Sequence, residues 1–160
     1  MEPETEKILQ DLQKNPTVLQ MKRYVQHGAV STFQHCDAVA RMSCRLNRLF
    51  RLRADEAALV RAGMLHDFYL YDWHDPDPSH RLHGFRHPEW AAQNAVRYCR
   101  VDPRVRDAIR SHMWPLTLTK VPRSREAWLV CVADKLCALS ETFQRSRAID
   151  APTHTSNRNG

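Results

Sequence analysis

Six side chains whose types suit a transition-metal ion recur along the chain at wide intervals. They are His35, the adjacent pair His66 and Asp67, then His87, His112 and Asp134. A single histidine among apolar residues is usually a core residue, but imidazoles and carboxylates on successive helices are typical of a metal site in a helical bundle. Such nitrogen and oxygen ligands suit iron or manganese first, with zinc, cobalt or nickel as alternatives.

Asp134 is the ligand candidate with the most apolar surroundings, because it follows the run Val130 to Ala133. An ionised carboxylate is costly to bury there unless a cation or strong donors compensate. Four of the six residues could hold one metal ion with open positions, and His87 and His112 would allow a second, bridged by Asp67. Two such cations can polarise a phosphoryl group and activate a water molecule.

The order His, His-Asp, His, His, Asp resembles the HD-domain superfamily of metal-dependent phosphohydrolases, in the form whose two extra histidines support a two-metal centre. The resemblance runs from about Ser31 to Phe143. It implies ligand roles for all six residues and hydrolysis of a phosphate ester or phosphoanhydride of a nucleotide-like substrate by a metal-activated water. The glycine-tyrosine-proline signature of cyclic-dinucleotide enzymes is absent. The chain is most similar to small stand-alone bacterial HD hydrolases, some of which split dinucleoside polyphosphates.

Asp67 is expected to be catalytic as well as a ligand. Three further residues are candidates for catalytic contact with a small anionic, phosphate-containing substrate. His83 and Arg86 stand close to His87 in the sequence, and Lys135 follows Asp134, as lysine often does in the superfamily. Each could instead be a solvated surface residue. Lys120 and Arg123 are weaker candidates of the same kind.

The cysteines favour a reduced protein with no disulfide framework. Five are scattered singly, without a C-x-x-C pair, and most have apolar neighbours at helical spacing. We interpret them as small core residues. Cys36 and Cys131 stand near ligand candidates, so either could line the metal pocket. The acidic N-terminus lacks the regions of a signal peptide, so we expect a cytoplasmic protein.

Composition and charge leave one alternative open. The 160 residues suit a single domain, and no apolar run approaches the roughly 20 residues that span a bilayer, so no membrane association is expected. The net charge of +6 comes largely from arginines spaced along two segments, 41–53 and 97–110. They could form a solvated face or a field that attracts anions. The alternative function is a non-catalytic helical module with a structural metal, binding nucleic acid or a protein partner. No nucleic-acid motif accompanies the charge, so dedicated nucleic-acid recognition is not expected.

The apolar spacing predicts an all-α, single-domain bundle of about six to seven helices of the HD-domain type. Two N-terminal helices in residues 1–30 should pack on an HD domain at 31–146, and residues 147–160 should be a disordered tail. Capping residues and prolines place the helices at about 4–15, 17–25, 32–49, 56–65, 88–98, 103–112 and 124–143.

One long segment, residues 68–86, breaks the helical pattern. It is rich in aromatic and turn-forming residues, including Tyr69, Tyr71, Trp73 and His80. A long irregular connection inside a compact domain is often functional. We therefore predict a loop over the metal site that selects the substrate, although its rings could simply pack the loop onto the bundle.

Overall fold

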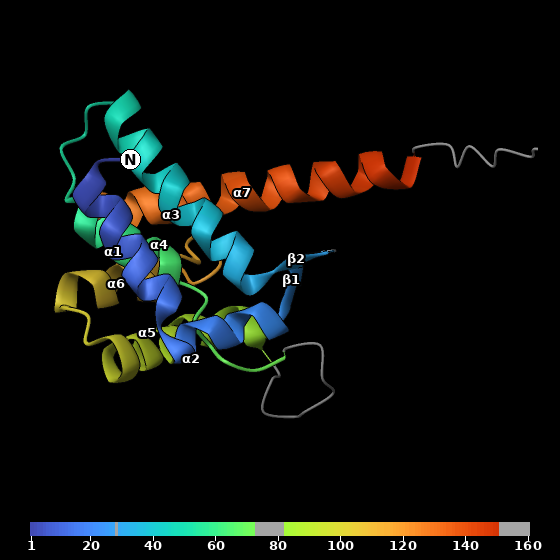
Figure 1. Cartoon of the computed structure of the whole chain (residues 1–160), viewed down its shortest axis with the longest axis horizontal. Coiled ribbons are helices and arrows are strands. Elements are labelled where there is room, and N and C mark those ends of the chain that lie inside the picture. The colour runs from blue at the N-terminus through green and yellow to red at the C-terminus, as the bar shows by residue number, and fades with distance from the viewer. Residues whose placement is uncertain (28, 73–81, 151–160) are drawn as a thin grey trace, which may run out of the picture.

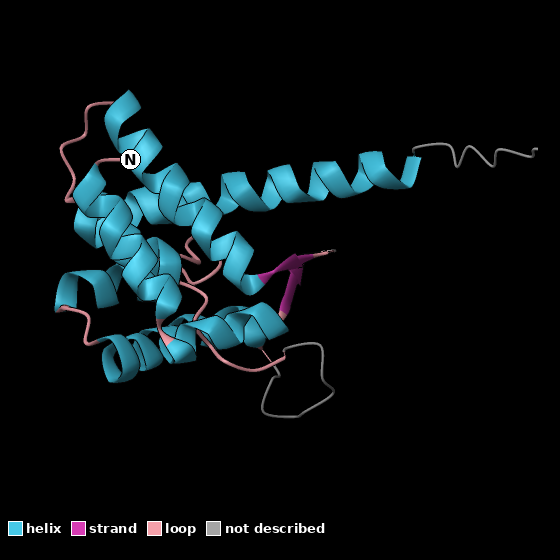
Figure 2. Cartoon of the chain, in the orientation of Figure 1, coloured by secondary structure: helices cyan, strands magenta, loops and turns pink. Residues whose placement is uncertain are grey.

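The computed structural model describes residues 1–27, 29–72 and 82–150, with the backbone alone for His27 and residues 144–150. Helices make up nearly all of its secondary structure (Figures 1 and 2). The elements are α1 (Pro3–Lys14), α2 (Pro16–Leu19), the 3-10 helix η1 (Gln20–Arg23), the hairpin of β1 (Val25–His27) and β2 (Val30–Ser31), α3 (Thr32–Leu49), α4 (Glu56–Leu65), α5 (His83–Cys99), α6 (Pro103–Ser111) and α7 (Arg125–Asp150). The predicted all-α class and helix number are confirmed. None of the described helices is long and apolar enough to cross a membrane.

The helix starts follow from local capping chemistry. Ser31 and Gln34 form a reciprocal capping box at α3, and the Asp55 carboxylate accepts from two backbone N–H groups at α4. Asp102 caps α6, and proline occupies the next position. These side chains satisfy N–H groups that have no partner within the helix, so α3, α4 and α6 begin where the sequence predicts.

The central helix α4 carries the His-Asp pair into the interior. Most of its side chains are buried, and it packs against α3. Gly63 permits this contact, because a Cβ atom there would lie only 2.6 Å from the Cα of Ala40. The close approach places His66 and Asp67, which directly follow α4, in the core.

The second predicted helix is wrong beyond Arg23. α2 and η1 are short, and the chain then enters β1, which pairs antiparallel with β2. The reason is tertiary pairing: the Tyr24 carbonyl accepts from the N–H of Thr32 at the start of α3. Gly28, the predicted helix terminator, lies outside the described residues.

The fifth helix begins at His83, so the predicted start at Pro88 is also wrong and Pro88 lies inside α5. A proline within a helix removes one hydrogen bond, here to the Gly84 carbonyl. The neighbouring carbonyl of His83 accepts from the side chain of His87 at 2.9 Å, which ties the extra turn to the helix. The connection after α4 is correspondingly shorter than 68–86, and Trp73 and His80 lie outside the described residues.

The C-terminal helix α7 extends well past the other helices (Figure 1). Its backbone stays helical to Asp150, past the predicted helix end at Phe143, and its last four residues overlap the tail predicted for 147–160. Arginine and alanine at 147–148 are good helix formers, which explains the continuation. Residues 151–160, the rest of that tail, lie outside the described residues.

Candidate metal centre

Five helices bring the six predicted ligand residues to one place. His35 lies on α3, His66 and Asp67 directly after α4, His87 on α5, His112 directly after α6, and Asp134 on α7. All are buried except Asp134, whose side chain is 14% exposed. Residues separated by up to about a hundred positions therefore share one small volume.

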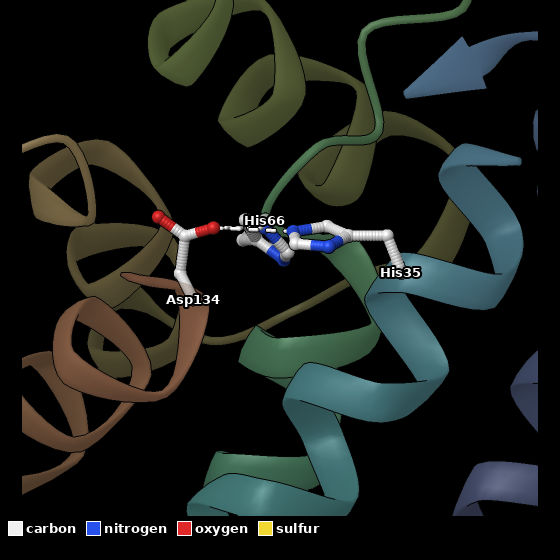
Figure 3. A group of neighbouring side chains, drawn as sticks. All are labelled: His35, His66 and Asp134. Carbon is white, nitrogen blue, oxygen red and sulfur yellow. Dashed lines mark hydrogen bonds and ion pairs between the residues drawn. The ribbon is translucent and has the colours of Figure 1, made fainter. Parts of the chain in front are cut away.

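His35, His66 and Asp134 form a first group of potential ligands (Figure 3). One Asp134 oxygen, Oδ1, lies 3.1 Å from His35 Nε2 and 3.6 Å from His66 Nε2. Figure 3 shows the carboxylate and the imidazoles directed toward one another from separate elements. The ligand atoms lie within 4.8 Å of one another, close enough to share one ion.

Asp67 joins this group to a second one, formed with His66 and His112. Asp67 Oδ2 lies 3.5 Å from His66 Nε2. Its other oxygen, Oδ1, lies 3.1 Å from His87 Nε2 and 3.5 Å from His112 Nε2. Because its two oxygens face different imidazoles, Asp67 has the geometry of a bridging ligand.

Backbone carbonyls fix the protonation of three of these imidazoles. The Nδ1 atoms of His66, His87 and His112 lie 2.7–2.9 Å from the carbonyl oxygens of Gly63, His83 and Ile109. A carbonyl only accepts, so in each neutral ring the proton is on Nδ1 and the lone pair is on Nε2. Such a bond commonly orients a metal-binding histidine. Three Nε2 atoms consequently point into the centre, and each offers a lone pair when its ring is neutral.

Two buried atoms of the centre have no hydrogen-bond partner among the described residues. They are Nε2 of His66 and Oδ1 of Asp67. Leaving a buried acceptor unsatisfied costs about 1–3 kcal/mol, and native proteins seldom do so without an ion or water at the site. An imidazole nitrogen and a carboxylate oxygen directed into one space fit a divalent cation, which at His66 would replace a proton.

The carboxylates of the centre remain ionised despite their burial. Burial alone would raise the pKa of Asp67, but the charge of His66 and then the neighbouring imidazoles of His87 and His112 hold that pKa well below its ordinary value. Burial likewise opposes ionisation of Asp134, but the hydrogen bond with His35 and the imidazole of His66 at 3.6 Å lower its pKa. The centre therefore offers two negative charges to a cation.

Two of the imidazoles differ in charge. Burial acts to lower the pKa of His35, but hydrogen bonds to Asp134 and Glu141 outweigh it and raise that pKa to about 10. For His112, burial lowers the pKa to about 3. His112 is thus neutral and ready to bind a cation, whereas at His35 a cation must replace a proton.

The structure adds two supporting residues that the sequence prediction missed. Both Glu141 carboxylate oxygens lie within 3.1 Å of His35 Nδ1. Gln26, on β1, donates from Nε2 to Asp67 Oδ2 and accepts from the Tyr69 hydroxyl at 2.7 Å. Glu141 stands seven residues after Asp134, two helical turns along the same face, and that spacing could have identified it. No sequence signal identifies Gln26.

A pocket of about 640 Å³ opens onto the centre. Its lining joins the ligand residues Asp67, His87, His112 and Asp134 to an apolar wall of Met113, Pro115, Leu116 and Ala138. His83 and Lys135, two of the three predicted substrate residues, also line it. Arg86 is exposed on α5 and is not among the described lining residues.

His83 and Lys135 are both held in place at the pocket. The His83 ring stacks on that of His87 at 4.6 Å between centroids, and its Nδ1 lies 2.6 Å from the Tyr71 hydroxyl. Lys135 Nζ donates to the carbonyls of His112 at 2.9 Å and Cys131 at 3.2 Å. Lys135 thus ties α7 to the segment that carries the candidate ligand His112.

The two cysteines considered for the pocket do not line it. Cys36 Sγ lies 3.7 Å from His66 Nδ1, behind the ring. Cys131 Sγ donates to the Trp114 carbonyl at 3.3 Å. All five cysteines are free, and burial raises the pKa of Cys131. These features agree with packing roles.

Comparison with known proteins agrees with this geometry. The family described as HD domain matches residues 32–139, which is more than half of the chain and includes all six candidate ligands. No curated protein and no solved structure matches the chain.

Proposed function

Since the chain belongs to the HD-domain family, we propose that it is an enzyme that hydrolyses a phosphate ester or phosphoanhydride of a nucleotide-like compound. The family consists in general of metal-dependent phosphohydrolases. The observation that carries the proposal is the pair of unsatisfied buried atoms, His66 Nε2 and Asp67 Oδ1, beside an open pocket.

The six ligand residues would hold one or two divalent cations. His35, His66, Asp67 and Asp134 would bind the first, and His87 and His112 would bind the second with Asp67 shared. Iron or manganese suits this nitrogen and oxygen set best, with zinc, cobalt or nickel as alternatives. A bound cation would supply Lewis acidity at a phosphoryl group and acidity at a water molecule.

The protein's own residues would position the substrate. Lys135 places a positive charge at the pocket, 3.8 Å from Asp134 Oδ2, and its field would favour an anionic group there. His83 is held by Tyr71 within the same lining and could donate a proton to a departing oxygen. Arg86 does not line the pocket, so it would contact only a substrate that extends beyond the pocket.

Pocket size and composition support a nucleotide-like substrate. A volume of about 640 Å³ falls in the range typical of small-molecule sites. The wall of Met113, Pro115 and Leu116 offers apolar contact to a base, beside residues that would receive phosphate. A dinucleoside polyphosphate is one such substrate.

A hydrolysis screen tests the proposal. Protein prepared without chelator would be loaded with manganese or ferrous iron and given nucleotides, dinucleoside polyphosphates and generic phosphate esters. We expect turnover of at least one compound, lost in Asp67→Ala and retained in Asp11→Ala, which removes an exposed carboxylate on α1. Absence of turnover by fully metallated protein would favour the non-catalytic binding module.

A further inference from the structure

A second pocket, of about 500 Å³, lies between α6 and the start of α7. Its lining contains four cationic side chains, Arg104, Arg110, Lys120 and Arg123, and one carboxylate, Asp107. We call it the basic pocket. It shares no lining residue with the pocket at the metal centre.

Neighbouring carboxylates leave much of this positive charge uncompensated. Arg110 Nε and Lys120 Nζ both donate to a single oxygen, Glu89 Oε2, at 2.9 Å. Asp107 is paired with Arg106, which lies outside the lining. The Glu89 carboxylate thus pairs with two cations of the pocket, and Asp107, the carboxylate in the lining, pairs with an arginine outside it.

The two remaining cations are the most available. Arg104 reaches Asp55 only at 3.7 Å, and its side chain is 57% exposed. Within the described part of the chain, Arg123 has no acidic partner at ion-pair distance. Guanidinium groups bind phosphate oxygens through paired N–H donors, so these two side chains are suited to an incoming anion.

The start of α7 adds to the positive electrostatic field of the basic pocket. Ser124 lines the basic pocket and caps this helix, its Oγ accepting from the N–H of Ala127 at 3.1 Å. A helix N-terminus carries a partial positive charge and favours an anion. Ser111, on α6, also lines the pocket, and its hydroxyl donates to the Asp107 carbonyl at 2.9 Å.

We propose that the basic pocket binds the di- or triphosphate group of a small anion, at a site separate from the metal centre. Several oxygens on adjacent phosphorus atoms match several cations spread over one cavity better than a single carboxylate would. The group could belong to an inorganic polyphosphate or to a nucleotide tail. This inference does not depend on the proposed hydrolysis.

Calorimetric titration of the protein as purified with inorganic tripolyphosphate, at low salt, tests the site. The double variant Arg104→Ala/Arg123→Ala should bind at least about tenfold more weakly than the wild type. The matched control is Arg45→Ala/Arg97→Ala, which removes two exposed arginines from α3 and α5 and should bind as the wild type does. Any loss of metal to the probe is common to all three proteins, so the difference between them reports on the basic pocket.

The outcomes separate the sources of the anion and the competing explanations. A non-hydrolysable nucleoside triphosphate that binds more tightly than tripolyphosphate, with the same loss in the double variant, would assign a nucleotide. Equal affinity in all three proteins would overturn the site, provided their melting temperatures agree. If the double variant melts early, Arg104→Lys/Arg123→Lys keeps both charges but lacks the paired N–H donors, so it should bind more weakly than the wild type, and equal binding by this variant would overturn the site. Binding of a short DNA duplex without binding of tripolyphosphate would also overturn it.

Discussion

The Nε2 atoms of His87 and His112 lie 3.0 Å apart, although the Nδ1 of each ring faces a main-chain carbonyl. Both rings in their neutral form therefore direct a lone pair at the other. Two acceptors at this distance repel each other unless a proton or a cation lies between or beside them. With Asp67 Oδ1 only 3.1 Å from His87 Nε2, the arrangement favours a second metal ion over a merely structural pair.

Replacing His112 by alanine should remove one metal ion and leave the other. The group of His35, His66 and Asp134 stays intact in this variant, whereas the group around His112 loses a ligand. Elemental analysis of purified protein should find the metal content halved. Asp67→Ala should lose both ions because Asp67 faces both groups, and Asp11→Ala should lose neither. Unchanged metal content in His112→Ala would show that His112 is not a metal ligand.

Glu141→Gln should weaken metal binding without removing a direct ligand. The carboxylate holds His35 through Nδ1, and partners of this kind are typically worth about 10–100-fold in metal affinity. A chelator-competition titration measures the change. The glutamine keeps the shape of the side chain but lacks the charge that favours a proton on Nδ1.

Glu4→Gln is the matched control, because Glu4 is exposed on α1 and the substitution removes the same charge. It should leave metal affinity within about twofold of wild type. Equal affinities in the Glu141 and Glu4 variants would show that His35 is oriented by its packing in α3 alone.

The positions of the candidate ligands His66 and His112 were predictable from sequence because each directly follows a helix with clear boundaries. Asp55 and Asp102 fix the starts of α4 and α6, and the helix lengths then carry His66 and His112 to the ends that face the core. Local capping chemistry acts within a few residues, so it can be read without knowing the fold.

Gln26 shows what sequence reasoning misses. It reaches Asp67 only because β1 pairs with β2 and leaves the helical path that the apolar spacing around it predicts. The start of α5 failed for a similar reason, since a side-chain bond from His87 supports a helical turn before a proline. Both depend on contacts that no local pattern encodes.

Which apolar residues of α7 are buried also depends on tertiary contacts. Val130, Ala133 and Cys137 are buried, whereas Leu136, Leu139 and Phe143, at the same spacing of three and four residues, are exposed. The sequence shows that the helix exists, but the neighbours that cover one face and not another are set by tertiary packing.

Gly63→Ala should destabilise the protein by about 1–3 kcal/mol, because the added Cβ would lie 2.6 Å from the backbone Cα of Ala40 and 2.8 Å from its N. Backbone atoms cannot move aside without shifting α3 against α4. The shift would also displace the Gly63 carbonyl that orients His66. Urea unfolding of the metal-loaded protein measures the loss, and metal affinity should fall with it.

Gly84→Ala is the contrasting substitution. Its Cβ would meet Leu116 Cδ2 at 3.2 Å, the end of a flexible side chain that can rotate. Alanine is favoured over glycine inside a helix by up to about 1 kcal/mol, so this variant should be neutral or more stable. A Gly63→Ala protein as stable as Gly84→Ala would mean that α3 and α4 are not in close contact.

Alkylation of the cysteines should be slow in the folded protein and strongly dependent on pH. Burial raises the pKa of Cys44 to about 12 and that of Cys99 to about 11, so few thiolates exist at neutral pH. The alkylation rate should therefore keep rising from pH 8 to 11, whereas in denaturant it should level off above a pKa of about 8.5.

The same raised pKa of the buried thiols also affects the stability of the fold. The stabilisation that the protein gains by keeping these thiols neutral is fully present below about pH 8.5 and declines as pH rises toward 11. Peptide mapping by mass spectrometry after timed exposure to iodoacetamide distinguishes the sites, and Cys99, which is only partly buried, should react before Cys44. Alkylation of Cys44 at pH 7.5 as fast in the folded as in the unfolded protein would contradict its place in the core.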